Sequence, residues 1–135
     1  MIKSYSSTQA VVSTSSGESE FYSAVKGTSN GLGLKSMSMD LGQDKRLRIM
    51  IDSTAAKAMA LRRGLGRARH IETQFLWIQY IYHDKKAYMS KVGTDDNLGD
   101  VGTKYLDCAT LWKFMTMAGF HEMKGDSKLA LREAI

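Results

Sequence analysis

The segment from residue 46 to residue 54 constrains the fold of this chain most strongly. Residues 46–51 (RLRIMI) alternate arginine or methionine with branched aliphatic side chains, which is typical of a strand with one buried face. Asp52 ends this strand, and Ser53 and Thr54 follow as capping residues of an alanine-rich helix. A strand that leads directly into a helix favours a domain in which helices pack on a sheet.

Similar signals recur along the chain. Residues 15–18 (SSGE) form a capping box at the start of a long helix that Gly42 should close, and residues 70–85 have the clearest amphipathic helical pattern. The expected strands lie at residues 9–14, 46–51 and 87–92, and the expected helices at about residues 15–41, 55–61, 70–85, 98–105 and 111–118. This alternation predicts an α/β or α+β domain.

The composition limits the classes of protein that the chain can represent. Hydrophobic residues make up 43% and charged residues 24% of 135 positions, as in one ordinary globular domain. One cysteine, Cys108, allows no internal disulfide, and no Cys or Cys/His spacing suits zinc. No apolar run is long enough to cross a membrane. We therefore expect an intracellular protein of the cytoplasm or nucleus, without a membrane partner.

Basic residues are concentrated in one short segment. The chain carries a formal net charge of +5, and glycines at positions 64 and 66 suit a loop within that segment. Its candidate nucleic-acid-binding residues are Arg62, Arg63, Arg67, Arg69 and His70. The loop can contact nucleic-acid phosphates, but many arginine-rich surface loops bind nothing, and charge alone leaves both interpretations open.

Three carboxylates stand out by their position. Glu20 lies one turn inside the first helix, Asp52 at the tip of a strand, and Asp100 at the start of a late helix. Acids on separate elements can converge to hold hard cations such as Mg²⁺, with Mn²⁺ as an alternative. Each acid also has an ordinary role available, as a capping residue or as a solvated residue near a helix N-terminus.

Four short motifs in one order resemble the ribonuclease H domain of copia-type retrotransposon polyproteins. Residues 15–22 (SSGESEFY) are similar to its SSxEAEY helix start, and residues 51–56 (IDSTAA) to its DNxSA strand end. Residues 69–72 (RHIE) are similar to KHID, and residues 97–106 (NLGDVGTKYL) to QLADILTKPL. The resemblance covers about residues 3–106 and implies that Glu20, Asp52 and Asp100 are metal-binding acids.

The resemblance also implies a fold and an activity. The family domain is a mixed sheet flanked by helices, and this sequence matches it from the third strand onward. We therefore expect an α/β, ribonuclease H-like fold without the first two strands, over residues 1–119, and a C-terminal tail over residues 120–135. The family cuts the RNA strand of RNA–DNA hybrids by two-metal hydrolysis. Its fourth acid has no match in this sequence, so we expect the chain alone to be inactive or weak.

Two other interpretations remain open at this stage. The chain can be a non-catalytic nucleic-acid-binding or protein-interaction remnant of a retroelement. It can also be a piece that folds stably only within a longer polyprotein, where the reverse-transcriptase portion would be its partner. Strand-end Ser53 and the glycines at 99 and 102 depart from the family pattern, and the two glycines should loosen the helix expected over residues 98–105.

Overall fold

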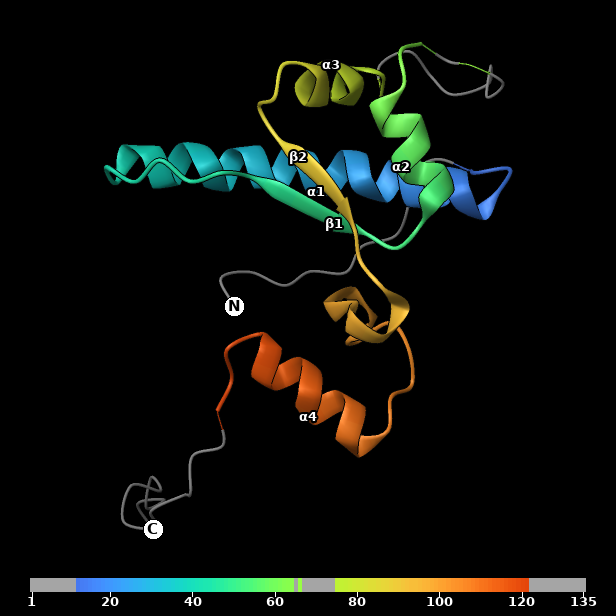
Figure 1. Cartoon of the computed structure of the whole chain (residues 1–135), viewed down its shortest axis with the longest axis vertical. Helices are drawn as coiled ribbons and strands as arrows, with labels where there is room; N and C mark the ends of the chain where they lie inside the picture. Colours follow the sequence, from blue (N-terminus) through green and yellow to red (C-terminus); the bar gives the residue numbers. More distant parts are fainter. Residues whose placement is uncertain (1–11, 65, 67–74, 122–135) are drawn as a thin grey trace, which may run out of the picture. The chain divides into compact units, whose positions relative to one another are not determined.

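The computed structural model describes residues 12–64, 66 and 75–121 (Figure 1). The chain divides into two compact units between Asn97 and Leu98. We call the described residues up to Asn97 the N-terminal unit and residues 98–121 the C-terminal unit, and each is described by itself. The division of the chain into residues 1–119 and a tail stays a prediction.

A long helix opens the N-terminal unit. Helix α1 spans Ser16–Asp40, and Ser15 caps it by accepting a hydrogen bond from the backbone N of Glu18. Gly42 follows the helix with a φ of +74°, a left-handed conformation that favours glycine and ends the helix. The start and the end expected from the capping box and from Gly42 are both confirmed.

The residues just before α1 differ from the prediction. Residues 12–14, the described part of the strand expected over residues 9–14, are not in a strand, and residues 9–11 lie outside the described residues. The backbone N and the Oγ1 of Thr14 instead donate to Oε2 of Glu18, at 2.6 and 2.8 Å. Glu18 is only 1% exposed, and its carboxylate holds the backbone of Thr14 just before the helix. This backbone is therefore not available for strand pairing.

The two described strands pair in parallel. Strand β1 spans Arg48–Ile51 and strand β2 spans Tyr88–Lys91, with Ile51 opposite Lys91. Helix α2 (Thr54–Leu61) and helix α3 (Trp77–His83) lie between them in sequence, as a parallel connection requires. The strands expected at 46–51 and 87–92 are thus confirmed in shorter form. The described chain is a mixed α/β structure with a small two-stranded parallel sheet.

Helix α3 is shorter than its sequence pattern suggests. Phe75 and Leu76 precede the helix instead of belonging to it, and the helix ends at His83 rather than Lys85. Lys85 has a φ of +56°, which no α-helix accommodates. Residues 70–74 lie outside the described residues. The buried stripe is nevertheless confirmed at Ile78 and Tyr82.

The core of the N-terminal unit joins all of these elements. Helix α2 contacts α1, α3 and both strands, and α1 contacts β1. Phe75 packs edge-on against Tyr22, with ring centroids 4.9 Å apart. The buried core cluster contains Phe21, Tyr22, Ala24, Val25, Ile51, Ala56, Ala60, Ile78, Tyr82, Ala87 and Met89.

The C-terminal unit corrects a second expectation. The helix expected over residues 98–105 is a single 3₁₀ turn, Leu98–Asp100, followed by a bridge between Val101 and Lys104. Gly102 has a φ of +83°, which interrupts any α-helix there. Helix α4 spans Cys108–Met117 and is followed by Gly119 at a φ of +84°. The helix expected over residues 111–118 therefore exists but begins three residues earlier.

The earlier start of α4 has a local cause. Asp107 is its N-cap and accepts a hydrogen bond from the backbone N of Thr110 at 2.9 Å. Hydrogen bonds from the side chain and then from the backbone N of Thr110 lower the pKa of the Asp107 carboxyl below its ordinary value. Among the helices of the described residues, α4 included, none has both the length and the apolar character needed to cross a membrane.

Candidate functional site

Asp52 lies where strand β1 ends and helix α2 begins. The next residue, Ser53, caps α2 by accepting a hydrogen bond from the backbone N of Ala56 at 3.1 Å. The Asp52 side chain is partly buried, and its Oδ2 accepts a hydrogen bond from Nδ2 of Asn97 at 3.2 Å. Asp52 and Asn97, the first residue of the 97–106 motif, thus meet although 45 positions separate them.

Lys91 adds a positive charge at the same end of the sheet. It is the register partner of Ile51, and its Nζ lies 2.8 Å from Oγ1 of Thr54. Lys91 and Asn97 are not among the site residues that the sequence patterns single out. The parallel pairing explains their position, because the carboxyl ends of parallel strands share one edge of the sheet.

Glu20 lies on an exposed position of α1. The first turn of α1 packs closely on the first turn of α2, because a Cβ at Gly17 would lie only 2.9 Å from Cβ of Ala55. Glu20 is three residues beyond Gly17, a rise of about 4.5 Å along the helix. The structure therefore brings together the helix start that carries Glu20 and the strand end that carries Asp52.

Asp100 belongs to the C-terminal unit. It is 7% exposed, and its Oδ2 lies 2.9 Å from Nζ of Lys104 in an ion pair. Its backbone O also accepts hydrogen bonds from the backbone N of Thr103 and of Lys104. The convergence of Asp100 with Glu20 and Asp52 stays a prediction. Among the described residues, no three His, Cys, Asp or Glu side chains form a group suited to a metal ion.

The arginine-rich segment begins as the predicted loop. Gly64 and Gly66 both have positive φ angles, +77° and +56°. Arg63 is exposed and donates from Nε to Nε2 of His83 at 2.7 Å. Arg62 is partly buried, and its guanidinium lies against Gly66. A Cβ added to Gly66 would lie only 2.6 Å from Nη1 of Arg62. Arg67, Arg69 and His70 lie outside the described residues.

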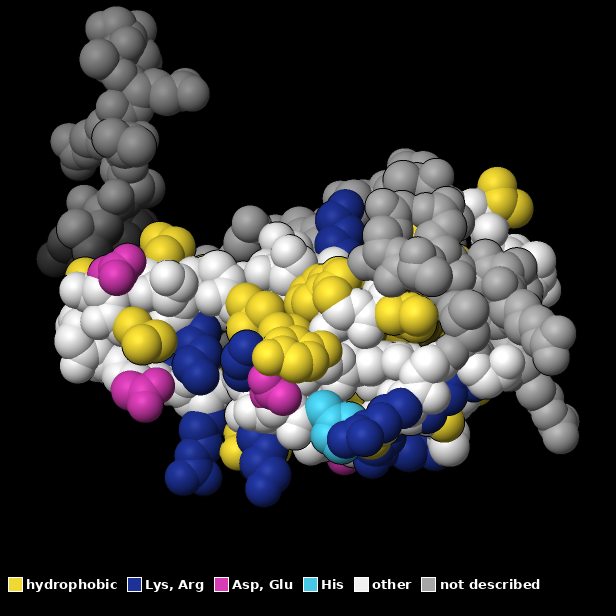
Figure 2. Space-filling view, turned by 90° about the horizontal axis from the view of Figure 1, so that it is seen from above, with side chains coloured by type: hydrophobic (Ala, Val, Ile, Leu, Met, Phe, Trp, Pro, Cys, Tyr) yellow, Lys and Arg dark blue, Asp and Glu magenta, His cyan; other side chains and the backbone are white. Residues whose placement is uncertain are grey.

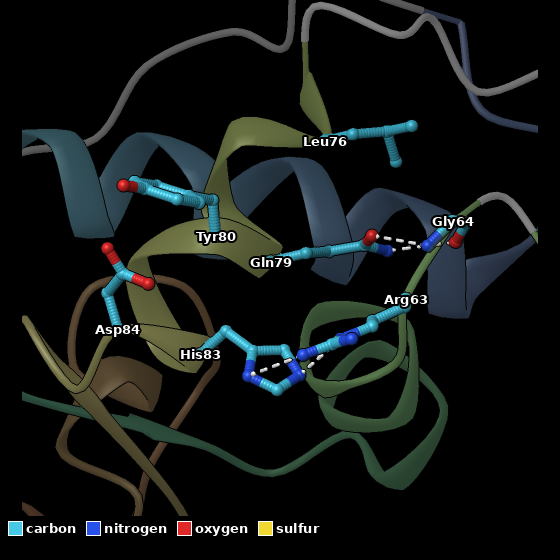
Figure 3. A pocket seen from close by; sticks show the side chains of 7 residues that line it. All are labelled: Arg63, Gly64, Leu76, Gln79, Tyr80, His83 and Asp84. Atoms are coloured by element: carbon cyan, nitrogen blue, oxygen red, sulfur yellow. Dashed lines mark hydrogen bonds between the residues drawn. The ribbon is translucent and has the colours of Figure 1, made fainter.

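The side chain of Gln79 fixes this loop to α3 (Figure 3). Its Oε1 accepts from the backbone N of Gly64 at 2.8 Å, and its Nε2 donates to the backbone O of Gly64 and of Met59 at 3.0 and 2.9 Å. Gln79 is not among the candidate site residues that the sequence patterns single out. One signal for it exists, since Gln79 lies four positions after Phe75 and interrupts an otherwise apolar helical stripe.

Comparison with known proteins identifies no relative. No protein-family model, no curated protein and no solved structure matches the chain.

The donor chemistry of the three acids suits a magnesium ion. Carboxylate oxygens are the ligands that this hard cation takes, and Glu20 and Asp52 are not fully buried. The Asn97 amide donates a hydrogen bond to one oxygen of Asp52 and so fixes the orientation of that carboxylate. Asp100 fits less directly, because Lys104 is paired with one of its oxygens and a cation would compete with that ammonium group.

Proposed function

We propose that this chain is a ribonuclease H-type unit of a copia-like retroelement, which hydrolyses the RNA strand of RNA–DNA hybrids with Mg²⁺ or Mn²⁺. The proposal includes a ribonuclease H-like arrangement of its sheet and helices. Its main support is the environment of Asp52. That aspartate directly follows a parallel strand and contacts Asn97, and the strand before it and the helix after it both contact the helix that carries Glu20.

The roles of the residues follow from their chemistry. Glu20, Asp52 and Asp100 would hold the metal, which when bound lowers the pKa of a water molecule and stabilises charge on the phosphate. Asn97 orients the Asp52 carboxylate through its 3.2 Å hydrogen bond. Lys91, at the same edge of the sheet, supplies a positive charge for the phosphate backbone. Lys104 is paired with Asp100 and would have to give up that ion pair for Asp100 to hold the cation.

The activity of the 135-residue chain should be low. The family uses a fourth acid, for which this sequence has no match, and three carboxylates hold two divalent cations poorly. The first prediction is therefore slow, Mg²⁺-dependent cleavage of the RNA strand of a hybrid, which Asp52→Asn abolishes. The measurement is product formation from a hybrid labelled on its RNA strand, during long incubations with excess enzyme.

Asp44→Asn is the matched control, because Asp44 is an exposed acid just before β1 and its loss changes the net charge equally. It should leave cleavage unchanged. Calorimetric titration with Mn²⁺ gives a second readout, and Asp52→Asn should weaken that binding whereas Asp44→Asn should not. The proposal fails if Asp52→Asn alters neither cleavage nor Mn²⁺ affinity.

A second candidate function is non-catalytic binding of nucleic acid. The net charge of +5 and the exposed Arg63 beside His83 favour it. On this alternative, the chain would bind hybrid in a salt-dependent way, Asp52→Asn would leave that binding unchanged, and no cleavage would be detected. The two candidate functions thus differ in the effect of one substitution.

A further inference from the structure

A pocket of about 370 Å³ lies between the loop that follows α2 and one side of α3 (Figure 3). Arg63 and Gly64 line it from the loop, and Gln79, Tyr80, His83 and Asp84 from α3 and its end. Figure 2 shows a face of the molecule on which basic side chains, a histidine and hydrophobic side chains lie side by side. The pocket does not include any of the three acids.

The wall of this pocket is held in place by partly buried hydrogen bonds. Gln79 is 8% exposed, and its amide bonds both the N and the O of Gly64 as well as the O of Met59. Because these three bonds use the polar atoms of Gln79, its amide serves to position the loop rather than to meet a ligand. The backbone beside Arg63 is thereby fixed.

Arg63 is in turn oriented by His83. Its Nε donates to Nε2 of His83 at 2.7 Å, and its Nη2 lies 3.5 Å from Nδ1 of the same ring. The terminal nitrogens of the guanidinium retain their fork of donors, which matches the oxygens of a phosphate. Holding the fork by Nε reduces the conformational entropy that Arg63 loses when it binds an anion.

The neighbouring residues offer a different kind of contact. Tyr80 is 59% exposed, so its ring is accessible to a flat ligand. Nζ of Lys86 lies 4.8 Å from the ring centroid and 3.6 Å from Oδ2 of Asp84. Arg63 and Asp84 line the pocket, and Lys86 lies beside it against Tyr80 and Asp84, so the charge in this neighbourhood is net positive. The Asp84 carboxylate can accept a hydrogen bond from a hydroxyl or an amino group.

We propose that this pocket binds a nucleotide, with the phosphate on Arg63, the base stacked on Tyr80, and Asp84 accepting from the sugar or the base. An accessible aromatic ring beside oriented cations is the combination that recognises unpaired nucleotides. The nucleotide can be a free one or one residue of a single strand. In the second case, and only if the proposed hydrolytic function is right, one strand can reach both this pocket and Asp52.

The reach follows from the length of α2. This helix has eight residues, so it is about 12 Å long, and it joins Asp52 at one end to Arg62 and Arg63 at the other. In duplex geometry that length corresponds to roughly three or four nucleotides of one strand. A tail of single-stranded RNA next to a hybrid could therefore occupy the pocket while the hybrid meets the acids.

The test measures binding of a fluorescein-labelled, single-stranded RNA oligonucleotide to the full chain by anisotropy, with EDTA present. Cleavage by the acids plays no part under these conditions, so this test can fail or succeed independently of the hydrolytic proposal. Arg63→Gln and Tyr80→Leu should each weaken binding about tenfold, and Tyr80→Phe should bind like the unmodified chain. Adenosine 5′-monophosphate as competitor distinguishes the two sources: displacement indicates that a single nucleotide suffices, and no displacement indicates a nucleotide within a strand.

Arg48→Gln and Tyr88→Leu are the matched controls, because both residues are exposed on the sheet of the same unit. Each control should change the affinity less than twofold. Thermal unfolding of every variant separates loss of binding from loss of structure. Arg63→Lys keeps the charge but loses the guanidinium fork, so it separates the contribution of the fork from that of the charge. The proposal is overturned if Arg63→Gln weakens binding no more than Arg48→Gln, or if Tyr80→Leu leaves the affinity unchanged.

Discussion

Single glycines in α1 show how one residue type can have opposite effects. By helix propensity alone, each glycine in this helix lowers its stability relative to alanine. The surroundings differ, however. A Cβ at Gly27 meets nothing within 4 Å, whereas a Cβ at Gly17 would lie 2.9 Å from Cβ of Ala55. The close approach at Gly17 is a feature that only the folded structure reveals.

We expect Gly27→Ala to raise the free energy of unfolding by about 0.5–1 kcal/mol, because alanine restricts the unfolded chain and fills open space. Gly17→Ala should lower it by roughly 1–3 kcal/mol, because the first turns of α1 and α2 must move apart. Urea denaturation of the two variants beside the unmodified chain measures both values. An equal gain from both substitutions would show that the Gly17 contact is not tight.

Thr28 and Tyr82 form a buried polar contact between α1 and α3. Oγ1 of Thr28 donates to the backbone O of Ala24 at 2.7 Å, so the Tyr82 hydroxyl must donate to Oγ1 across the 2.8 Å contact. Thr28→Val would leave the Tyr82 hydroxyl buried without an acceptor, at a cost of about 1–3 kcal/mol, whereas Tyr82→Phe should cost about 1 kcal/mol. The double variant should be less destabilised than the sum, and a double-mutant cycle by urea denaturation measures this coupling.

The same pair predicts a pH dependence. Burial raises the pKa of the Tyr82 hydroxyl above its ordinary value of 10.0, and the hydrogen bond with Thr28 opposes that rise only in part. Above about pH 10 the unfolded chain therefore binds fewer protons at this residue than the folded chain, and stability falls as pH increases. The stability difference between the unmodified chain and Tyr82→Phe should shrink from pH 10 upward and be constant below it.

At the scale of elements, local signals located most of the secondary structure. Capping residues and closing glycines predicted both ends of α1, and the alternation that ends on Asp52 predicted β1 and α2. The prediction failed at residues 98–105, because the positive φ of Gly102 and the bridge from Val101 to Lys104 exclude the helix expected there. It failed also at residues 12–14, where a local side-chain contact, the bond from Thr14 to Glu18, replaces strand pairing.

Gln79 links three elements, and its replacement tests how the arginine-rich loop is held. Gln79→Ala removes three hydrogen bonds, each contributing about 1 kcal/mol, and should speed amide hydrogen exchange at Gly64. Gln79→Glu should be at least as harmful, since a carboxylate would face the carbonyl groups of Met59 and Gly64. Gln43→Ala, at an exposed position after α1, is the control and should change neither stability nor exchange at Gly64.

At the scale of the whole molecule, the α/β class could be predicted, but the partners of the site residues could not. Strands that alternate with helices limit the architecture, and the resulting parallel pair is observed. The contacts of Asp52 with Asn97, and of Lys91 with Thr54, depend on the strand register and on the path of the chain after β2. The local sequence around Asp52 or Thr54 encodes neither of these contacts. The sequence patterns therefore did not predict Asn97 and Lys91 as partners.

Mn²⁺ offers a direct test of the proposed metal site. If Glu20, Asp52 and Asp100 bind one cluster of cations, substoichiometric Mn²⁺ should broaden the backbone amide signals of all three residues together, because a paramagnetic ion relaxes nearby nuclei. Asp44, an exposed acid, should keep its signal, and excess Mg²⁺ should restore the others. Lys104→Met should strengthen Mn²⁺ binding by removing the ammonium group paired with Asp100, as long as that acid is a ligand. Broadening at Asp52 without any at Asp100, and no effect of Lys104→Met, would exclude a site shared by the three acids.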